Sequence, residues 1–162
     1  MQLNYRLLNT ILFLGSVIGM SFALYLEHVV GLEPCPLCVF QRVGLIGMGI
    51  FSLIALIHNP ASTWLRKTYM VLSTLAISWS VGVAARHVWL QSLPPDQVPS
   101  CGPGLDYLVE ALPFKAVLEQ VLSGSGECAE IDWVFLGHSL PVWSLVFFMV
   151  LFIINIFVLV RR

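Results

Sequence analysis

The chain has 162 residues, of which 58% are hydrophobic and only 10% charged, and its mean hydropathy is +0.88. Soluble domains carry about 25% charged residues, so this composition excludes an ordinary soluble domain and indicates a membrane protein. The net charge of −1 argues against a nucleic-acid-binding protein, which needs a basic patch or stripe. The length suits about one domain, and we expect a single membrane domain over residues 1–162.

Four long apolar runs occupy most of the chain. The spans that they predict cover about residues 7–26, 39–57, 68–90 and 139–160. A helix of about 20 residues crosses ~30 Å of hydrocarbon, so each run is long enough to span a bilayer. The first run also resembles a signal peptide, although it is longer than the usual 7–15 apolar residues. The sequence therefore predicts an all-α fold, a four-helix transmembrane bundle with outer loops at about 27–38 and 91–138.

Basic residues outside the spans lie mainly on one side of this topology. Four spans place both termini on the same side, which also holds the loop between the second and third spans. The basic residues of that side are Arg6, Arg66, Lys67, Arg161 and Arg162. The opposite side holds only Lys115. The positive-inside rule therefore predicts that both termini are cytoplasmic.

Within the long outer loop, apolar residues recur at helical spacing. They are Leu105, Leu108, Val109, Leu112, Phe114, Val117, Leu118, Val121 and Leu122. This pattern predicts one or two short amphipathic helices, which either lie flat in the outer interface or cap the bundle. In the spans, Gly15 with Gly19 and Ser78 with Gly82 have the small-residue spacing that allows two helices to approach closely.

All four cysteines fall in the outer loops or at their edges: Cys35, Cys38, Cys101 and Cys128. An even number of cysteines on that side indicates an oxidising compartment. Of the three possible pairings, Cys35 with Cys38 and Cys101 with Cys128 is the simplest. Neighbouring prolines and glycines predict that the second pair lies in exposed, mobile backbone, where a disulfide exchanges readily, but a purely structural disulfide remains an alternative. We expect no metal, because the second pair lacks the C-x₂-C spacing of zinc sites.

The first pair forms a CxxC motif just where the second helix should begin. The unpaired N–H groups and the dipole of a helix N-terminus stabilise a thiolate, which favours Cys38 as a leaving group in thiol exchange. Arg42 follows by one helical turn and needs a partner at the membrane edge: a thiolate, a carbonyl of a bound cofactor or a lipid phosphate. His87 lies at the same depth on the third span and is suited to hydrogen bonding with a carbonyl.

These features together resemble the DsbB family of bacterial inner-membrane disulfide oxidoreductases. The resemblance covers nearly the whole chain. It is strongest at Cys35–Arg42 (CPLCVFQR), His87–Gln91 (HVWLQ) and Cys128–Gly137 (CAEIDWVFLG). In that family the residue before the arginine is often acidic, and here it is Gln41. The orientation of Arg42 is therefore open at this stage.

The resemblance implies a mechanism for these positions. A reduced periplasmic thiol oxidase similar to DsbA would attack the Cys101–Cys128 disulfide and form a mixed disulfide with Cys101. Cys128 would then attack Cys35 and free Cys38, which would face a ubiquinone or menaquinone from the membrane quinone pool. Arg42 and His87 would bind that cofactor. The disulfide of DsbA is strongly oxidising, at about −120 mV, so its regeneration needs a stronger oxidant such as a quinone.

The resemblance also implies a location and leaves rival functions. The expected location is the bacterial inner membrane, as a multi-pass protein whose cysteines face the periplasm. A DsbB paralogue that serves a dedicated client would share all these features. A quinone reductase similar to vitamin K epoxide reductase normally carries its CxxC late in the chain, whereas here it is early. A non-enzymatic membrane scaffold with two structural disulfides is the last alternative.

Overall fold

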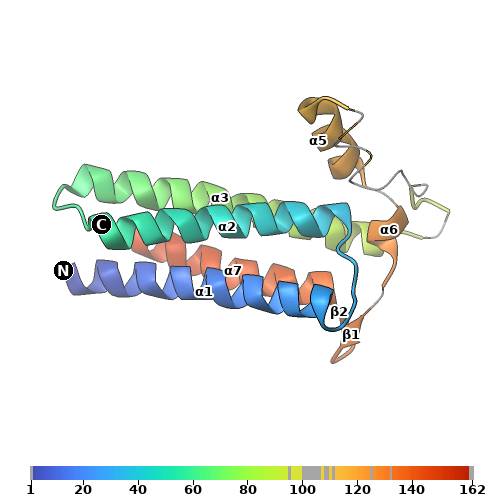
Figure 1. Cartoon of the computed structure of the whole chain (residues 1–162), viewed down its shortest axis with the longest axis horizontal. Coiled ribbons are helices and arrows are strands. Elements are labelled where there is room, and N and C mark those ends of the chain that lie inside the picture. Colours follow the sequence, from blue (N-terminus) through green and yellow to red (C-terminus); the bar gives the residue numbers. More distant parts are fainter. Residues whose placement is uncertain are drawn as a thin grey trace.

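The computed structural model describes residues 2–94, 96–99, 107, 110, 112–124, 126–131 and 133–160. Four long helices form a bundle (Figure 1): α1 (Gln2–His28), α2 (Pro36–His58), α3 (Thr63–Gln91) and α7 (Leu140–Val160). Each is long and apolar enough to cross a membrane. The predicted all-α four-helix bundle is thus confirmed, and α1 and α3 begin earlier in the chain than the spans predicted for them.

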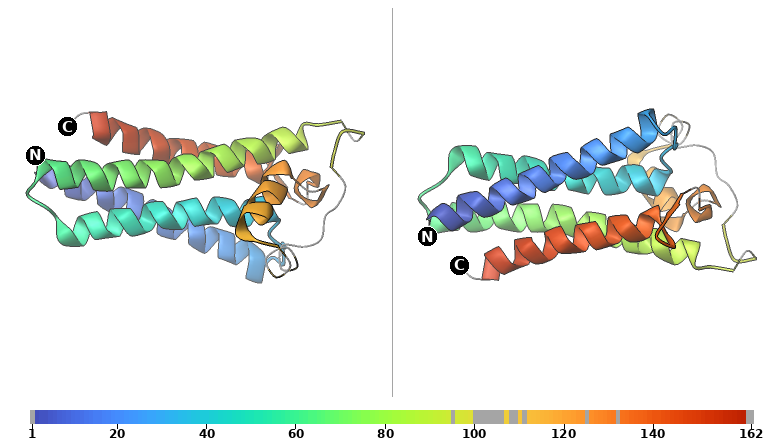
Figure 2. Two further views of the ribbon diagram at one scale, coloured as in Figure 1. Left: turned by 90° about the horizontal axis from the view of Figure 1, so that it is seen from above. Right: turned by 90° about the horizontal axis from the view of Figure 1, so that it is seen from below.

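The bundle has two different ends. The start of α1 and the end of α7 lie together at one end, beside the loop from α2 to α3 (Figures 1 and 2). At the other end lie the short helices α5 (Phe114–Ser123) and α6 (Gly126–Ala129) and the two strands. Because α2 begins with the CxxC motif, we call this the cysteine end.

Local sequence explains where α2 begins and ends. Cys35 has extended backbone, and Pro36 occupies the first helical turn, where the missing N–H of proline removes no helical hydrogen bond. At the other terminus Asn59 is left-handed, with φ of 38°, and its N–H bonds to the Ala55 carbonyl oxygen. This is a usual helix C-cap, and Pro60 follows it.

Small residues let the long helices approach closely. Gly15 and Gly19 of α1 face Leu151 and Phe147 of α7, whose side-chain ends would have to shift to admit a Cβ at either glycine, so the close contact expected of this pair is confirmed. A Cβ added at Gly82 would have no atom of another helix within 4 Å. The spacing of Ser78 and Gly82 therefore does not mark a helix contact.

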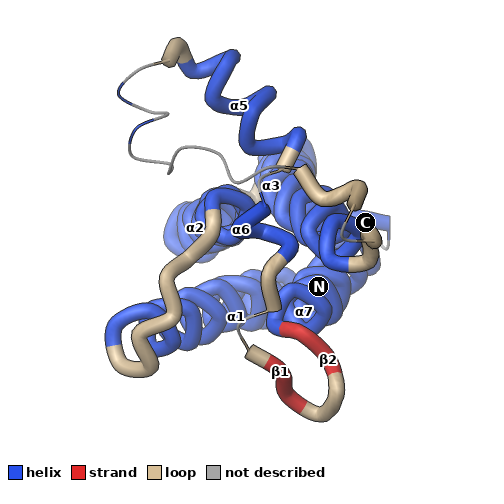
Figure 3. Tube along the Cα trace, turned by 90° about the vertical axis from the view of Figure 1, so that its right-hand side faces the viewer, coloured by secondary structure: helices blue, strands red, loops and turns tan. Residues whose placement is uncertain are grey.

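Helix α5 lies beside α3 at the cysteine end and projects away from the other long helices (Figure 3). Its Val117 and Val121 are buried with Leu37 of α2 and Leu90 of α3. Arg86 donates from Nε to the Leu122 carbonyl oxygen at 3.1 Å and from Nη2 to that of Ser123 at 3.0 Å. These contacts support the capping interpretation of this amphipathic segment. Of the residues that predicted it, Leu105, Leu108 and Val109 lie outside the described residues.

Two very short strands precede α7, which the sequence analysis did not predict. Strands β1 (Val134–Phe135) and β2 (His138–Ser139) pair antiparallel, with Val134 opposite Ser139. The turn between them consists of Leu136, with φ of 50°, and Gly137, with φ of 81°. Two consecutive residues with positive φ make the tight turn that suits a hairpin.

Candidate functional site

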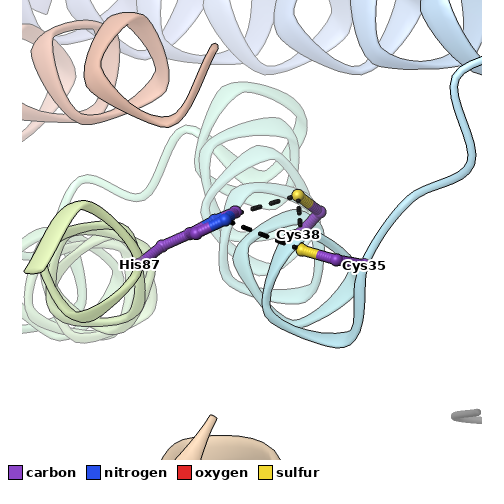
Figure 4. A group of neighbouring side chains, drawn as sticks. All are labelled: Cys35, Cys38 and His87. Carbon is purple, nitrogen blue, oxygen red and sulfur yellow. Dashed lines mark hydrogen bonds between the residues drawn. The ribbon is translucent and has the colours of Figure 1, made fainter. Parts of the chain in front are cut away.

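The two cysteines of the CxxC motif lie side by side at the start of α2 (Figure 4). Cys35 immediately precedes the helix and Cys38 lies in its first turn, as the sequence indicated. Both are half-buried free thiols, and the Cys35 Sγ donates to the Cys38 Sγ at 3.1 Å. The pair is therefore in its dithiol form, with Cys38 at the positive end of the helix dipole.

His87 projects from α3 toward both sulfurs (Figure 4). Its Nε2 lies 3.8 Å from the Cys35 Sγ and its Nδ1 lies 3.9 Å from the Cys38 Sγ. The histidine is only 3% exposed. The sequence predicted that His87 lies at the outer end of the third span and contacts a bound carbonyl. The structure adds that the ring contacts the dithiol directly.

Gln41 is a site residue that the sequence analysis treated only as a departure from the family pattern. It is 4% exposed, and its Nε2 lies 3.2 Å from His87 Nδ1. Its backbone carbonyl accepts a 2.7 Å hydrogen bond from the Ser80 hydroxyl of α3. The side chain therefore orients the histidine ring, and the backbone ties α2 to α3 at the same level. Helical spacing alone places Gln41 near Cys38, but only the packing of α2 on α3 brings it to His87.

Arg42 finds its partner on α1. Its Nη1 donates to the Glu27 carboxylate, and its Nη2 lies 3.5 Å from the Ala23 carbonyl oxygen. From the sequence, the partners proposed for Arg42 were a thiolate, a carbonyl of a bound cofactor and a lipid phosphate. The Glu27 carboxylate was missed. A signal for it existed: a short loop joins α1 to α2, so the last turn of one helix lies beside the first turns of the next.

A cavity of about 340 Å³ opens beside the dithiol. Apolar side chains of α1 and α7, among them Ile18, Phe22 and Phe147, form much of its wall. The lining at the start of α2 and on α3 includes Cys35, Cys38, Gln41, Arg42 and His87. Further polar side chains in the lining are Glu33, Gln91, Glu127, Glu130, Ser139 and Ser144. An apolar pocket with a few converging polar groups is typical of a site for a small organic ligand.

The third described cysteine lies close to this dithiol. Cys128, in α6, is 1% exposed and packs in a buried cluster with Leu37 and Leu90, and Cys35 packs against the same cluster. The expectation that Cys128 lies in exposed backbone is wrong, because α5 and α6 fold over the end of the bundle and cover it. Cys101 lies outside the described residues, and so does the predicted Cys101–Cys128 pair.

The dithiol and His87 also form a possible metal-ligand set. The two sulfurs and a ring nitrogen lie within 4.8 Å of one another. Two thiolates and an imidazole suit zinc with an open fourth position. The cysteine spacing predicted no metal, and activity measured with and without a chelator separates metal-dependent from metal-independent activity.

Comparison with known proteins decides the family. The sequence model of the family described as "Disulfide bond formation protein DsbB" matches residues 5–158. A protein of Acinetobacter baumannii named Disulfide bond formation protein B is 65% identical over 161 residues, 99% of this chain and 94% of that protein. The chain belongs to the DsbB family. DsbB relatives of the same name occur in Acinetobacter baylyi (64% identical; 100% of this chain, 95% of the relative) and a Psychrobacter species (58%; 98% and 94%).

Membership of the DsbB family agrees with the sequence resemblance and makes this chain a multi-pass membrane protein of disulfide bond formation, with a thiol oxidoreductase role. Two features of the site around Arg42 can be compared with the family pattern. In this DsbB chain the residue before Arg42 is an amide that contacts His87, and the carboxylate that pairs with Arg42 comes from α1 instead.

Proposed function

We propose that this protein is a thiol:quinone oxidoreductase of the bacterial inner membrane. In this role it re-oxidises a periplasmic dithiol oxidase similar to DsbA and passes the electrons to ubiquinone or menaquinone. One observation carries the proposal: the Cys35–Cys38 dithiol opens onto an apolar cavity that also contains Arg42 and His87. Family membership supports the thiol chemistry.

The cavity suits a quinone ring in size and chemistry. Its apolar wall at the α1 and α7 side suits a planar quinone ring with an isoprenoid tail, and a quinone has two carbonyl oxygens that accept hydrogen bonds. Arg42 would donate to one carbonyl through a charge-assisted bond, and the His87 ring would donate to the second. A bound quinone supplies a two-electron, two-proton acceptor beside Cys38.

The cysteines would act in sequence. The partner's thiolate attacks Cys101, which breaks the Cys101–Cys128 bond and releases Cys128 as a thiolate. Cys128 attacks Cys35, breaks the Cys35–Cys38 bond and releases Cys38. The packing of Cys128 and Cys35 around one buried cluster supports this exchange. The partner's second thiol would then displace Cys101 and complete the partner's disulfide, and Cys101 would re-form its bond with Cys128 and release Cys35. The Cys35–Cys38 bond would re-form as the two electrons and two protons of this dithiol reduce one quinone to a quinol.

Purified protein in detergent tests this function directly. It is mixed with a reduced DsbA-like partner and short-chain ubiquinone or menaquinone, and quinone absorbance is followed with and without chelator. We expect chelator-independent loss of quinone that requires all four cysteines. Cys38→Ser should abolish quinone reduction while Cys101 still traps the partner in a mixed disulfide.

Two results would contradict the proposal. Normal quinone reduction by the Cys38→Ser protein removes Cys38 from its assigned role. No reduction of either quinone by the wild-type protein, with its disulfides intact, favours a scaffold. A DsbB paralogue with a dedicated client is distinguished by the partner, since it reduces quinone with that client's dithiol but not with a general thiol oxidase.

A further inference from the structure

Arg42 is held between two helix ends of opposite polarity. It lies in the second turn of α2, while its two partners, the Glu27 carboxylate and the Ala23 carbonyl, lie in the last turns of α1. Among the residues that the structure describes, Glu27 is the only carboxylate within ion-pair distance of Arg42. The two side chains are partly buried, with 18% of Arg42 and 26% of Glu27 exposed.

The position of Glu27 is unfavourable for its own helix. A carboxylate in the last turn of a helix meets the negative end of the dipole, which costs free energy. The interaction with Arg42 offsets this cost and removes an unpaired charge from the membrane edge. The location of Glu27 is therefore explained by the arginine and not by the stability of α1.

The two charged side chains differ in what they face. Arg42 lines the cavity, whereas Glu27 is not among the residues that line it. A guanidinium has five N–H donors, of which the contacts with α1 engage only two. Glu27 thus holds the guanidinium from behind and leaves donors free toward the cavity.

We propose that Glu27 is a positioning residue that holds Arg42 against the cavity and thereby sets the affinity for the quinone. The inference rests on the function proposed above. Without Glu27, the long side chain of Arg42 is free to reach toward the aqueous interface, as arginines near helix ends do. The guanidinium is then no longer held in the position that binds the carbonyl oxygen. Fixing it there when the quinone binds lowers the affinity for quinone.

Quinone kinetics of Glu27 variants test this inference. We expect Glu27→Ala to raise the KM for quinone about tenfold, as is reasonable for a partly buried ion pair, with little change in the KM for the reduced partner. Glu27→Asp should retain part of the affinity because the charge remains, and Glu27→Gln should lie between Asp and Ala. Glu119→Ala is the matched control, since Glu119 is exposed on α5 and its ion pair is with Lys115.

A double-mutant cycle separates positioning from a general structural role. If Glu27 acts through Arg42, Glu27→Ala should raise the KM for quinone no further when Arg42 is already alanine. An additive effect in the double variant, or an unchanged KM in Glu27→Ala, overturns the inference while the oxidase function stands. A wild-type protein that reduces no quinone overturns the oxidase function, and the role of Glu27 with it.

Discussion

The dithiol is surrounded by buried polar side chains that satisfy one another. Gln41 and His87 are both nearly inaccessible, and each supplies a partner for the other. A buried polar group without a partner costs about 1–3 kcal/mol, so their contact fixes both rotamers. With the Gln41 amide donating to Nδ1, the ring proton lies on Nε2, which faces the Cys35 sulfur. The Gln41 amide therefore determines which tautomer of His87 faces the dithiol.

Replacement of Gln41 by leucine tests this role at the scale of one residue. Gln41→Leu keeps a similar volume but removes the partner of His87, so the ring loses its fixed tautomer and orientation. We expect turnover with quinone to fall about tenfold, in the range seen when a supporting hydrogen bond is lost, while the protein remains folded. The rate of quinone reduction at saturating partner is the measurement.

Gln120→Leu provides the matched control for this substitution. Gln120 is exposed on α5, and a leucine there meets no site residue. Equal turnover of the Gln41→Leu and Gln120→Leu proteins would show that the contact with His87 does not matter to the reaction.

At the scale of elements, the site depends on how closely α2 and α3 approach. A Cβ added at Gly44 would clash with the Ser80 hydroxyl oxygen and would lie 2.6 Å from the Ala76 carbonyl oxygen. The hydroxyl can rotate, but the carbonyl belongs to the backbone of α3. Ser80 also bonds to the Gln41 carbonyl, so the same close contact aligns Gln41 with His87. Small residues thus position Gln41 and His87 relative to each other, in addition to allowing the helices to pack closely.

Alanine substitutions at two glycines should have opposite effects on stability. Gly44→Ala forces α2 and α3 apart, and overpacking of this kind costs about 1–3 kcal/mol. Gly82→Ala meets no atom within 4 Å and gains up to about 1 kcal/mol of helix propensity. Thermal unfolding in detergent, followed by circular dichroism, should show a lower Tm for the first variant and an equal or higher Tm for the second. A Tm of Gly44→Ala at or above that of the wild type would contradict the close approach.

At the scale of the whole molecule, charge and chemistry are separated along the bundle. The dithiol, Cys128 and the cavity lie at the cysteine end. The loop from α2 to α3 and the first turns of α3, which contain Arg66 and Lys67, lie at the opposite end, beside the start of α1 and the end of α7 (Figure 2). Basic residues favour the cytoplasmic side of a membrane, so this arrangement supports the proposal that the cysteine end faces the periplasm.

The orientation can be measured in intact cells. A green fluorescent protein fused after Arg162 should fluoresce, and alkaline phosphatase at the same position should be inactive, because both report a cytoplasmic location. A membrane-impermeant maleimide should label the reduced Cys35 or Cys38 in spheroplasts without lysis. Active phosphatase at the C-terminus would reverse the proposed orientation.

Local sequence was sufficient for the features that depend on hydrophobic length and on helix termini. Four apolar runs long enough to cross a bilayer determined the four-helix bundle, because no other structure of that composition satisfies its backbone hydrogen bonds in lipid. Pro36 and the apolar run after it determined that Cys38 begins a helix, since proline is favoured in the first turn. The positions of Arg42 and His87 near the ends of their apolar runs predicted that both lie at the same end of the bundle, and both line the cavity there.

Only the tertiary structure decided which side chains meet. The pairs Glu27 with Arg42 and Gln41 with His87 each join two helices, and the burial of Cys128 needs α5 and α6 folded over the bundle. A membrane helix is apolar on its lipid-facing side as well as its inner side, so its sequence has little periodicity to show which face turns inward. Close packing between helices sets that rotation, and with it the residues that reach the cavity.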